Sequence, residues 1–222
     1  MKTKNTVRTE TDMKSKIKSG YMDFVLTEGK NPASVYHFCK VADISEAEFY
    51  KYFTSFEGIE TSVWLDSLGE VIQKLESTDE YQGFGVREKI LSFFYAMVEE
   101  LRSNRSFFAK SSKNWFVPGK AMPAKKAVEK QLKPYFEKLI SEGFQTGELA
   151  ERPKISDYYP NALMVQFWFV LGFWMKDESP GFEDTDAAIE KGVNLGFDML
   201  KENTLDKALD LAKFLWGRAK MK

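Results

Sequence analysis

Apolar residues recur every three or four positions along most of this chain, which is the pattern of amphipathic α-helices. Met13, Ile17, Tyr21 and Phe24 share one helical face and predict a first helix that ends near Gly29. The same spacing predicts later helices at about 54–75, 86–108, 110–116, 123–142, 157–177, 184–202 and 204–220. We find no alternating strand pattern and no internal repeat, so the sequence predicts an all-α protein.

Residues 34–53 predict two short helices joined by a tight turn. The first carries an apolar stripe, which breaks at Asp43 and Ile44. Ser45 then follows as an N-cap, and Glu48 three residues later completes a capping box that opens the second helix. Two helices joined so closely form a helix-turn-helix, whose second helix enters the major groove in DNA-binding proteins.

Three further local features have structural consequences. Thr54 and Glu57 have the spacing of a second capping box at the start of the next helix. Pro134 falls inside the helix predicted over 123–142 and should kink it, since proline lacks a backbone donor. The glycines of residues 77–85 mark a boundary between an N-terminal module and a larger C-terminal bundle.

Composition is that of a globular protein with a substantial core. Hydrophobic residues make up 43% and charged residues 29% of the 222 residues, and aromatics reach 15%. The formal net charge is −1, so attraction to nucleic acid has to be local. The chain has a single cysteine, Cys39, which excludes an internal disulfide and is typical of a protein in a reducing cytosol. We recognise no signal peptide and therefore expect a cytoplasmic protein.

Residues 158–175 run without a charge for 18 positions and invite a membrane interpretation. Pro160, Asn161 and Gln166 interrupt the run, and charged residues flank it. A spanning helix needs about 20 apolar residues. We therefore favour a helix buried inside a bundle.

The N-terminal pattern resembles the TetR family of bacterial transcriptional regulators. The resemblance covers about residues 13–58 without a gap: Ser34-Val35 starts the second helix, Ala42-Asp43-Ile44-Ser45 forms the turn, and Tyr50-x-x-Phe53 and Ser55-x-Glu57 follow. The C-terminal part is similar only in outline, through its loop at Glu142–Leu149 and a final pair of helices. The resemblance implies a homodimer formed through the last two long helices.

The predicted organisation has four parts: a flexible basic arm (1–12), a three-helix helix-turn-helix head (13–58), a connecting helix and linker (59–84), and a helical ligand-binding and dimerisation domain (85–222). A solvated tail accounts equally well for the arm. The residues expected at DNA are Lys14, Lys18, Ser34, Val35, Ser45, Glu46, Ala47, Tyr50, Lys51 and Tyr52.

Two departures from the family weaken the expectation of DNA binding. Phe56 stands where the family usually has a lysine that helps to hold a phosphate, and Asp43 replaces the turn glycine. Residues 43–57 contain four acids against one base, although acids near a helix start also stabilise the helix. Glu46 could accept a hydrogen bond from cytosine N4, which is uncommon.

Aromatic residues of the C-terminal helices could line an apolar cavity for a small molecule or lipid. The candidates are Phe93, Phe94, Met97, Leu101, Phe108, Trp115, Met164, Phe167, Trp168, Leu171 and Trp174. Gln166 and Tyr95 could supply polar groups to such a site. Ordinary core packing together with a dimer seam explains the same residues equally well.

Other chemistry finds little support in the sequence. His37 is the only histidine and has no partners for a metal site or a catalytic triad, and no glycine-rich phosphate loop is present. We expect no enzyme activity, no metal and no cofactor.

Two functions remain open. The first is a homodimeric regulator that binds double-stranded DNA and responds to an apolar small molecule. The second is a TetR-fold lipid- or isoprenoid-binding protein that has lost DNA binding. The acidic recognition helix, Phe56 and the helix predicted over 204–222, which could contact a membrane surface peripherally, motivate this alternative.

Overall fold

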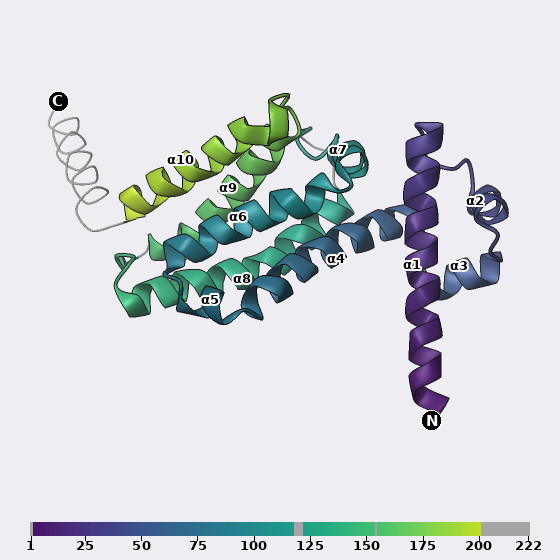
Figure 1. Ribbon diagram of the computed structural model, residues 1–222, viewed down its shortest axis with the longest axis horizontal. Helices are drawn as coiled ribbons and strands as arrows, with labels where there is room; N and C mark the ends of the chain where they lie inside the picture. The colour runs from purple at the N-terminus through teal and green to yellow at the C-terminus, as the bar shows by residue number, and fades with distance from the viewer. Residues whose placement is uncertain (1, 118–121, 154, 201–222) are drawn as a thin grey trace, which may run out of the picture. The chain divides into compact units, whose positions relative to one another are not determined.

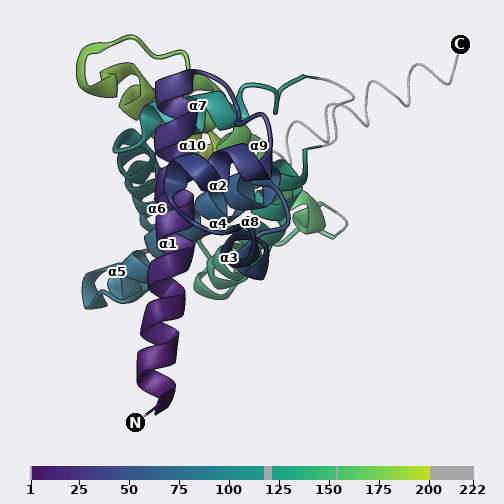
Figure 2. The ribbon, with the colours of Figure 1, turned by 90° about the vertical axis from the view of Figure 1, so that its right-hand side faces the viewer.

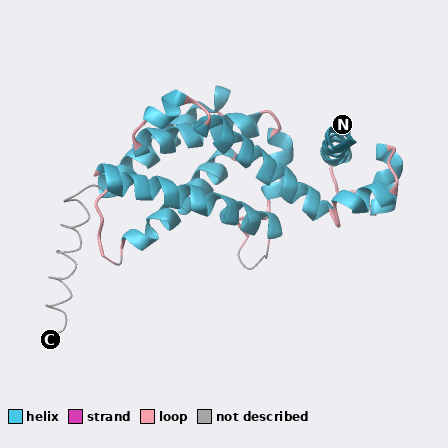
Figure 3. Ribbon diagram, turned by 90° about the horizontal axis from the view of Figure 1, so that it is seen from below, coloured by secondary structure: helices cyan, strands magenta, loops and turns pink. Residues whose placement is uncertain are grey.

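The computed structural model describes residues 2–117, 122–153 and 155–200, with side chains from Asp12 onward. This part of the chain contains helices and loops and no strand, as predicted (Figure 3). The elements in chain order (Figure 1) are α1 (Lys2–Glu28), α2 (Val35–Ala42), α3 (Glu46–Tyr52), α4 (Phe56–Glu76), α5 (Asp79–Gly83), α6 (Val86–Arg102), α7 (Arg105–Ser112), α8 (Pro123–Thr146), η1 (Ser156–Tyr158), α9 (Tyr159–Trp174), η2 (Pro180–Phe182) and α10 (Glu183–Leu200).

The helices form two compact units. The first contains the described residues of Met1–Glu70 and Glu100–Lys130, and the second contains Val71–Glu99 and the described residues from Gln131 onward. Residues 77–85, where the sequence predicts a boundary, lie in the second unit, and the predicted domain limits remain a prediction. α5 occupies part of this segment, and its Tyr81 is buried and shares a hydrogen bond of 2.6 Å with the hydroxyl of Tyr135 on α8.

The helix-turn-helix head consists of α1, α2 and α3, which lie side by side in the first unit (Figures 1 and 2). Its centre is aromatic: Tyr21, Phe38 and Phe49 are fully buried, and the Phe38 ring meets those of Tyr21 and Phe49 edge-on. The Tyr21 hydroxyl donates to Glu60 Oε1 at 2.6 Å. Burial and this hydrogen bond raise the pKa of Tyr21 far above its ordinary value.

The first helix is longer than the sequence pattern suggests. α1 ends at Glu28, and Gly29 adopts a positive φ of 67°, as the predicted stop requires. Its backbone is helical from Lys2, across the segment expected as a flexible arm. Residues 2–12 contain neither glycine nor proline, so nothing in the local sequence interrupts the helix. A contact of this segment with DNA remains a prediction.

The capping box predicted at Thr54 and Glu57 is wrong. α4 begins at Phe56, and Ser55 caps it by accepting a hydrogen bond of 3.1 Å from the backbone N–H of Gly58. The third helical position is therefore a glycine, which has no side chain to complete the reciprocal bond. Glu57 lies in the first turn of α4, where it favours the helix through its charge alone.

The helix predicted over 86–108 is divided into α6 and α7. The Ser103 hydroxyl donates to the Glu100 carbonyl at 2.8 Å, and the Asn104 side chain donates to that hydroxyl at 3.2 Å. Short polar side chains that bond to nearby backbone groups compete with the helical ladder, which accounts for the break. In α7, Phe107 and Phe108 are buried in the first unit.

α8 continues through Pro134 and ends four residues later than predicted, at Thr146. Pro134 is exposed, so the backbone carbonyl that it leaves unbonded lies on the solvent side of the helix. Gly147 follows with φ 75° and reverses the chain, which brings Leu149 back onto α8. A Cβ on Gly143 would lie 2.6 Å from Leu149 Cδ1, so this return needs glycine at position 143.

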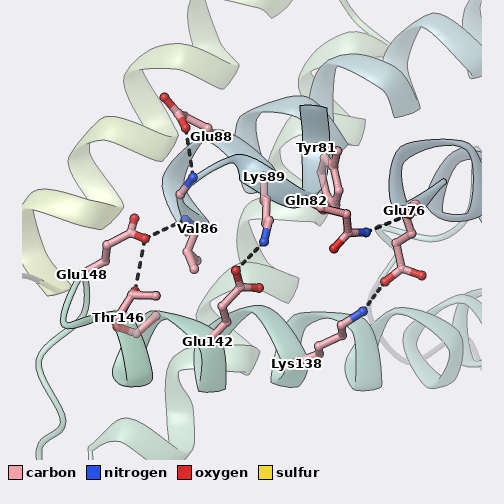
Figure 4. A network of polar contacts seen from close by, with 12 residues as sticks. Glu76, Tyr81, Gln82, Val86, Glu88, Lys89, Lys138, Glu142, Thr146 and Glu148 are labelled. Carbon is pink, nitrogen blue, oxygen red and sulfur yellow. Dashed lines mark hydrogen bonds and ion pairs between the residues drawn. The ribbon is translucent and has the colours of Figure 1, made fainter. Parts of the chain in front are cut away.

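The second unit holds a network of polar contacts among α4, α5, α6 and α8 (Figure 4). Lys89 is nearly buried and forms an ion pair with Glu142, while Lys138 pairs with Glu76 at 2.6 Å. Glu148 accepts from the backbone N–H of Val86 at 3.0 Å and so caps α6 from the turn after α8. The network satisfies the charges that these helices bring together.

α9 forms within the uncharged run of residues 158–175, and α10 packs against it. Leu163, Phe167, Leu171 and Trp174 of α9 are buried, as a bundle helix requires. No helix in the described ranges is long and apolar enough to cross a membrane. The final helix predicted over 204–220 lies outside the described residues.

Candidate nucleic-acid interface and apolar core

The two helices of the helix-turn-helix have the caps and the turn that the sequence predicts. Ser34 caps α2 by accepting from the His37 N–H at 3.1 Å. Asp43 ends α2 in the left-handed region, with φ 49° and ψ 57°. Ser45 and Glu48 form the predicted capping box: Ser45 Oγ accepts from the Glu48 N–H at 3.1 Å, and the Ser45 N–H donates to Glu48 Oε2 at 2.8 Å.

The outward face of α3 carries four of the predicted DNA contacts. Glu46, Ala47, Tyr50 and Lys51 are exposed, whereas Phe49 on the opposite face is buried. Positions i, i+1, i+4 and i+5 share one side of a helix, so these four side chains present a single surface. Of the other predicted contacts, Ser34 and Ser45 are exposed, and Val35 and Tyr52 are half-buried.

Lysines of α1 reach this region, although not all as predicted. Lys14 lies over the ring of Phe53 at 5.9 Å. Lys18 forms an ion pair of 2.5 Å with Asp66, which offsets its charge. Lys16 also reaches this region, since its Nζ donates to the Asp43 carbonyl at 3.0 Å and so lies at the turn. No sequence signal finds this contact, because 27 positions separate the two residues.

The charge of Glu48 is committed to the helix start. The backbone N–H and hydroxyl of Ser45 both donate to its carboxylate, and these bonds, with Lys16 nearby, lower the pKa of Glu48. Phe56 also has a structural role. Its ring stacks on that of Tyr21 at 5.3 Å and meets those of Phe38 and Phe49 edge-on, so it belongs to the aromatic centre of the head.

A hollow of about 290 Å³ lies beside the turn of the helix-turn-helix. Its walls come from α2, the turn and the start of α3: Tyr36, Cys39, Lys40, Asp43, Ile44, Ser45 and Glu46. Tyr36 and Lys40 are exposed on α2 and stand next to the predicted DNA contacts. Sequence reasoning did not select them, since only the fold shows that this side of α2 adjoins the turn.

The predicted ligand-pocket residues are distributed over both units. In the second unit, Phe93, Phe94 and Met97 are buried, and the Phe93 ring lies 5.1 Å from that of Tyr135 and 5.5 Å from that of Phe136. Also in that unit, Phe167, Leu171 and Trp174 are buried, while Met164 and Trp168 are half-buried. A shared cavity for these residues remains a prediction.

Leu101, Phe108 and Trp115 of the same prediction belong to the first unit. There Trp64 of α4 is the centre of the packing: its ring lies 4.7 Å from that of Phe108 and 4.6 Å from that of Trp115. The Trp64 indole N–H donates to Ser111 Oγ at 3.0 Å. These contacts account for the burial of Phe108 and Trp115 as core packing.

Among the described residues, no cluster of histidine, cysteine, aspartate or glutamate could hold a metal ion. The family model of the tetracyclin repressor-like C-terminal domain matches residues 89–215, which is more than half of the chain. The chain belongs to the TetR family.

Solved structures support the same fold over most of this TetR-family protein. One relative is a TetR-family transcriptional regulator from Syntrophomonas wolfei, with 18% identity and a TM-score of 0.68, over 87% of this chain and 99% of the other. A TetR-family transcription regulator from Shewanella sp. PV-4 has 13% identity and a TM-score of 0.61, over 86% and 99% of the two chains. No curated protein sequence matches the chain.

Apolar side chains on α9 and α10 of this TetR-family protein are exposed in the single chain. Val165, Phe169 and Phe173 recur every four residues along α9 and are 68%, 51% and 37% exposed. Leu195 and Met199 lie one turn apart on α10 and are also exposed. Gln166 of α9 lies against α10, where a Cβ on Gly192 would be 3.2 Å from its Nε2 atom.

Proposed function

We propose that this protein is a transcriptional regulator that binds double-stranded DNA as a homodimer and responds to an apolar small molecule. The observation that carries the proposal is the helix-turn-helix, with its capped second helix presenting Glu46, Ala47, Tyr50 and Lys51 outward. A recognition helix of this kind enters the major groove with its N-terminal residues toward the base edges.

The charges of the folded head favour DNA binding more than the count of acidic and basic residues in 43–57 suggests. Glu48 is bonded to Ser45, and Lys16 reaches the turn from α1. Lys14 and Lys40 add positive charge on the neighbouring helices. Phosphate neutralisation supplies most of the affinity for DNA, so these lysines would position the head on the backbone.

The exposed apolar stripes of α9 and α10 support the homodimer. An exposed apolar patch of this kind on a folded protein marks an interaction site. The two stripes lie on adjacent helices and contain no charged residue between Val165 and Phe173. A second copy of the same surface would cover both stripes. The resulting dimer would carry two helix-turn-helix heads, one for each half-site of an operator.

The apolar interior of the second unit supports the part of the proposal that concerns a small-molecule ligand. Phe93, Phe94 and Met97 contribute large apolar side chains there, as do Phe167 and Trp174. Sites between bundle helices take apolar molecules and orient them with a few polar groups. The proposed ligand is therefore a small apolar molecule.

Fluorescence anisotropy with DNA from upstream of its own gene tests the proposal. We expect salt-sensitive binding, with affinity falling steeply between low and physiological salt because lysines displace counterions. A control variant, Lys133→Gln, removes a charge from exposed α8 and should bind equally. Absence of salt-sensitive binding to any fragment would contradict the proposal.

One observation favours the alternative of a lipid- or isoprenoid-binding protein without DNA binding. Phe56 packs in the aromatic centre of the head at the position where the family usually has a phosphate-binding lysine, so that contact is lost. Organic extraction of the purified protein followed by mass spectrometry tests this alternative. A stoichiometric lipid together with no DNA binding would favour it over the regulator.

A further inference from the structure

Glu46 is the first residue of α3 and lies on its exposed face. Within the described ranges, no hydrogen bond or ion pair engages its carboxylate. Lys16, the nearby base that reaches the turn, donates to the Asp43 carbonyl instead. The carboxylate of Glu46 therefore faces outward with its hydrogen-bonding capacity unused.

Glu48, two positions later, differs in each respect. It is half-buried, its carboxylate accepts from the Ser45 hydroxyl at 2.7 Å and from the Ser45 N–H at 2.8 Å, and its role is to hold the start of α3. These capping bonds explain the presence of an acid at position 48, in the first turn of α3. Glu46 makes no such hydrogen bonds and favours the helix only through its charge in the first turn, whereas phosphates on bound DNA would repel that charge.

A carboxylate in the major groove discriminates strongly among the four bases. Guanine presents only acceptors there, and thymine presents an acceptor and a methyl group, so neither can donate to Glu46. Adenine offers an amino donor beside the N7 acceptor, which would repel the second carboxylate oxygen. Cytosine offers its N4 amino donor without an acceptor of its own beside it.

We propose that Glu46 is a specificity-determining residue that selects cytosine at one position of each operator half-site. The inference rests on the proposed DNA-binding function and deepens it. The phosphate contacts come from lysines of α1 and α2, and they position the head without distinguishing sequences. The bond from cytosine N4 to Glu46 then restores the free energy that the carboxylate loses by approaching the duplex.

Selection from a randomised duplex library tests the inference with three full-length proteins: wild type, Glu46→Gln and Glu57→Gln. Glu57 is exposed in the first turn of α4, directly after the head, so its variant removes the same charge at another place. The glutamine amide can donate and accept, which suits the N6 and N7 atoms of adenine. Circular dichroism and thermal melts establish that each variant is folded.

We expect wild type and Glu57→Gln to select cytosine at one half-site position, and Glu46→Gln to lose that preference roughly tenfold and to favour adenine there. If Glu46→Gln selects the same base as wild type, the inference is overturned and the regulator stands. If wild type selects no sequence but binds DNA, the inference also fails. If wild type binds no DNA at all, both the inference and the proposed function fail.

Discussion

Asp43 shows how a single side chain adapts the turn of the helix-turn-helix. Its backbone adopts the left-handed conformation that the family's glycine adopts without strain, and aspartate is among the few other residues that tolerate it. Phe56 is a comparable case, because an aromatic ring in the head replaces a surface lysine. Both departures from the family are compatible with a well-packed head.

Replacing Asp43 by glycine should raise the free energy of unfolding by up to about 1 kcal/mol, because glycine removes the strain of a positive φ. Asp43→Ala should lower the free energy of unfolding by about 1 kcal/mol, because alanine adopts the left-handed backbone conformation less readily than aspartate does. Asp43→Asn separates charge from conformation and should change stability little. Urea unfolding of the wild type and the three variants measures the differences. An alanine variant more stable than wild type would contradict the proposed backbone strain at position 43.

Asp177 links the end of α9 to the start of α10 through its carboxylate. Burial raises its pKa, but hydrogen bonds from Ser179 and Thr185, including that from the Thr185 N–H at 2.8 Å, outweigh burial and lower the pKa to about 2. A lowered pKa means that this contribution to stability is complete above the ordinary value of 3.8. It is lost as the pH falls toward about 2.

Asp177→Asn should therefore lower the free energy of unfolding at pH 7 by roughly 1–3 kcal/mol, because its amide cannot accept every bond that the carboxylate accepts. The difference between wild type and variant should shrink between pH 4 and pH 2. Denaturant unfolding at several pH values measures it. A difference that stays constant down to pH 2 would exclude Asp177 as its source.

At the scale of elements, the ends of helices are set by contacts that the local sequence shows only in part. The capping box of α3 was predictable because Ser45 and Glu48 are three residues apart. Glu148 caps α6 from 62 positions away, which no local pattern reveals. The start of α4 was misassigned by one residue because Thr54 and Ser55 are both good N-caps, and only the backbone path decides between them.

The end of α8 provides a test of element packing. Gly143→Ala should cost roughly 1–3 kcal/mol, since the new Cβ would overlap Leu149 Cδ1. In Gly143→Ala/Leu149→Ala the overlap is absent, so the double variant should lose less stability than the sum of the single variants. Gly147→Ala serves as a comparison in which strain alone acts, because no atom lies near its Cβ position. Additive losses from thermal melts would contradict the predicted overlap.

At the scale of the whole molecule, the sequence predicted the helical class and the helix-turn-helix, because periodicity and caps are local signals. It did not predict which unit each buried aromatic residue belongs to, because Phe93 and Phe108, predicted for one pocket, lie in different units. Periodicity reports that a side chain is buried and does not report which neighbours bury it. The part of the proposed DNA face that lies on α3 was predictable from the sequence. The contact of Lys16 with the turn is visible only in the folded structure.

The proposed dimer gives a prediction at this scale. Phe169→Asp places a charge in the exposed apolar stripe of α9 and should convert a dimer to a monomer, because burying an unpaired charge is costly. Gln145→Glu adds a charge to the exposed face of α8 and should leave the dimer intact. Light scattering coupled to gel filtration measures the masses. A Phe169→Asp variant that remains dimeric would place the interface elsewhere.

Cys39 gives the head an internal reporter. It is the only thiol of the chain, it is 3% exposed, and burial followed by the charges of Glu46 and Glu48 raises its pKa. The rate at which an alkylating reagent labels this thiol therefore rises with the fraction of time that motion of the head exposes the sulfur. Anything that clamps the helix-turn-helix, a bound operator above all, would slow that labelling without any probe having to be introduced.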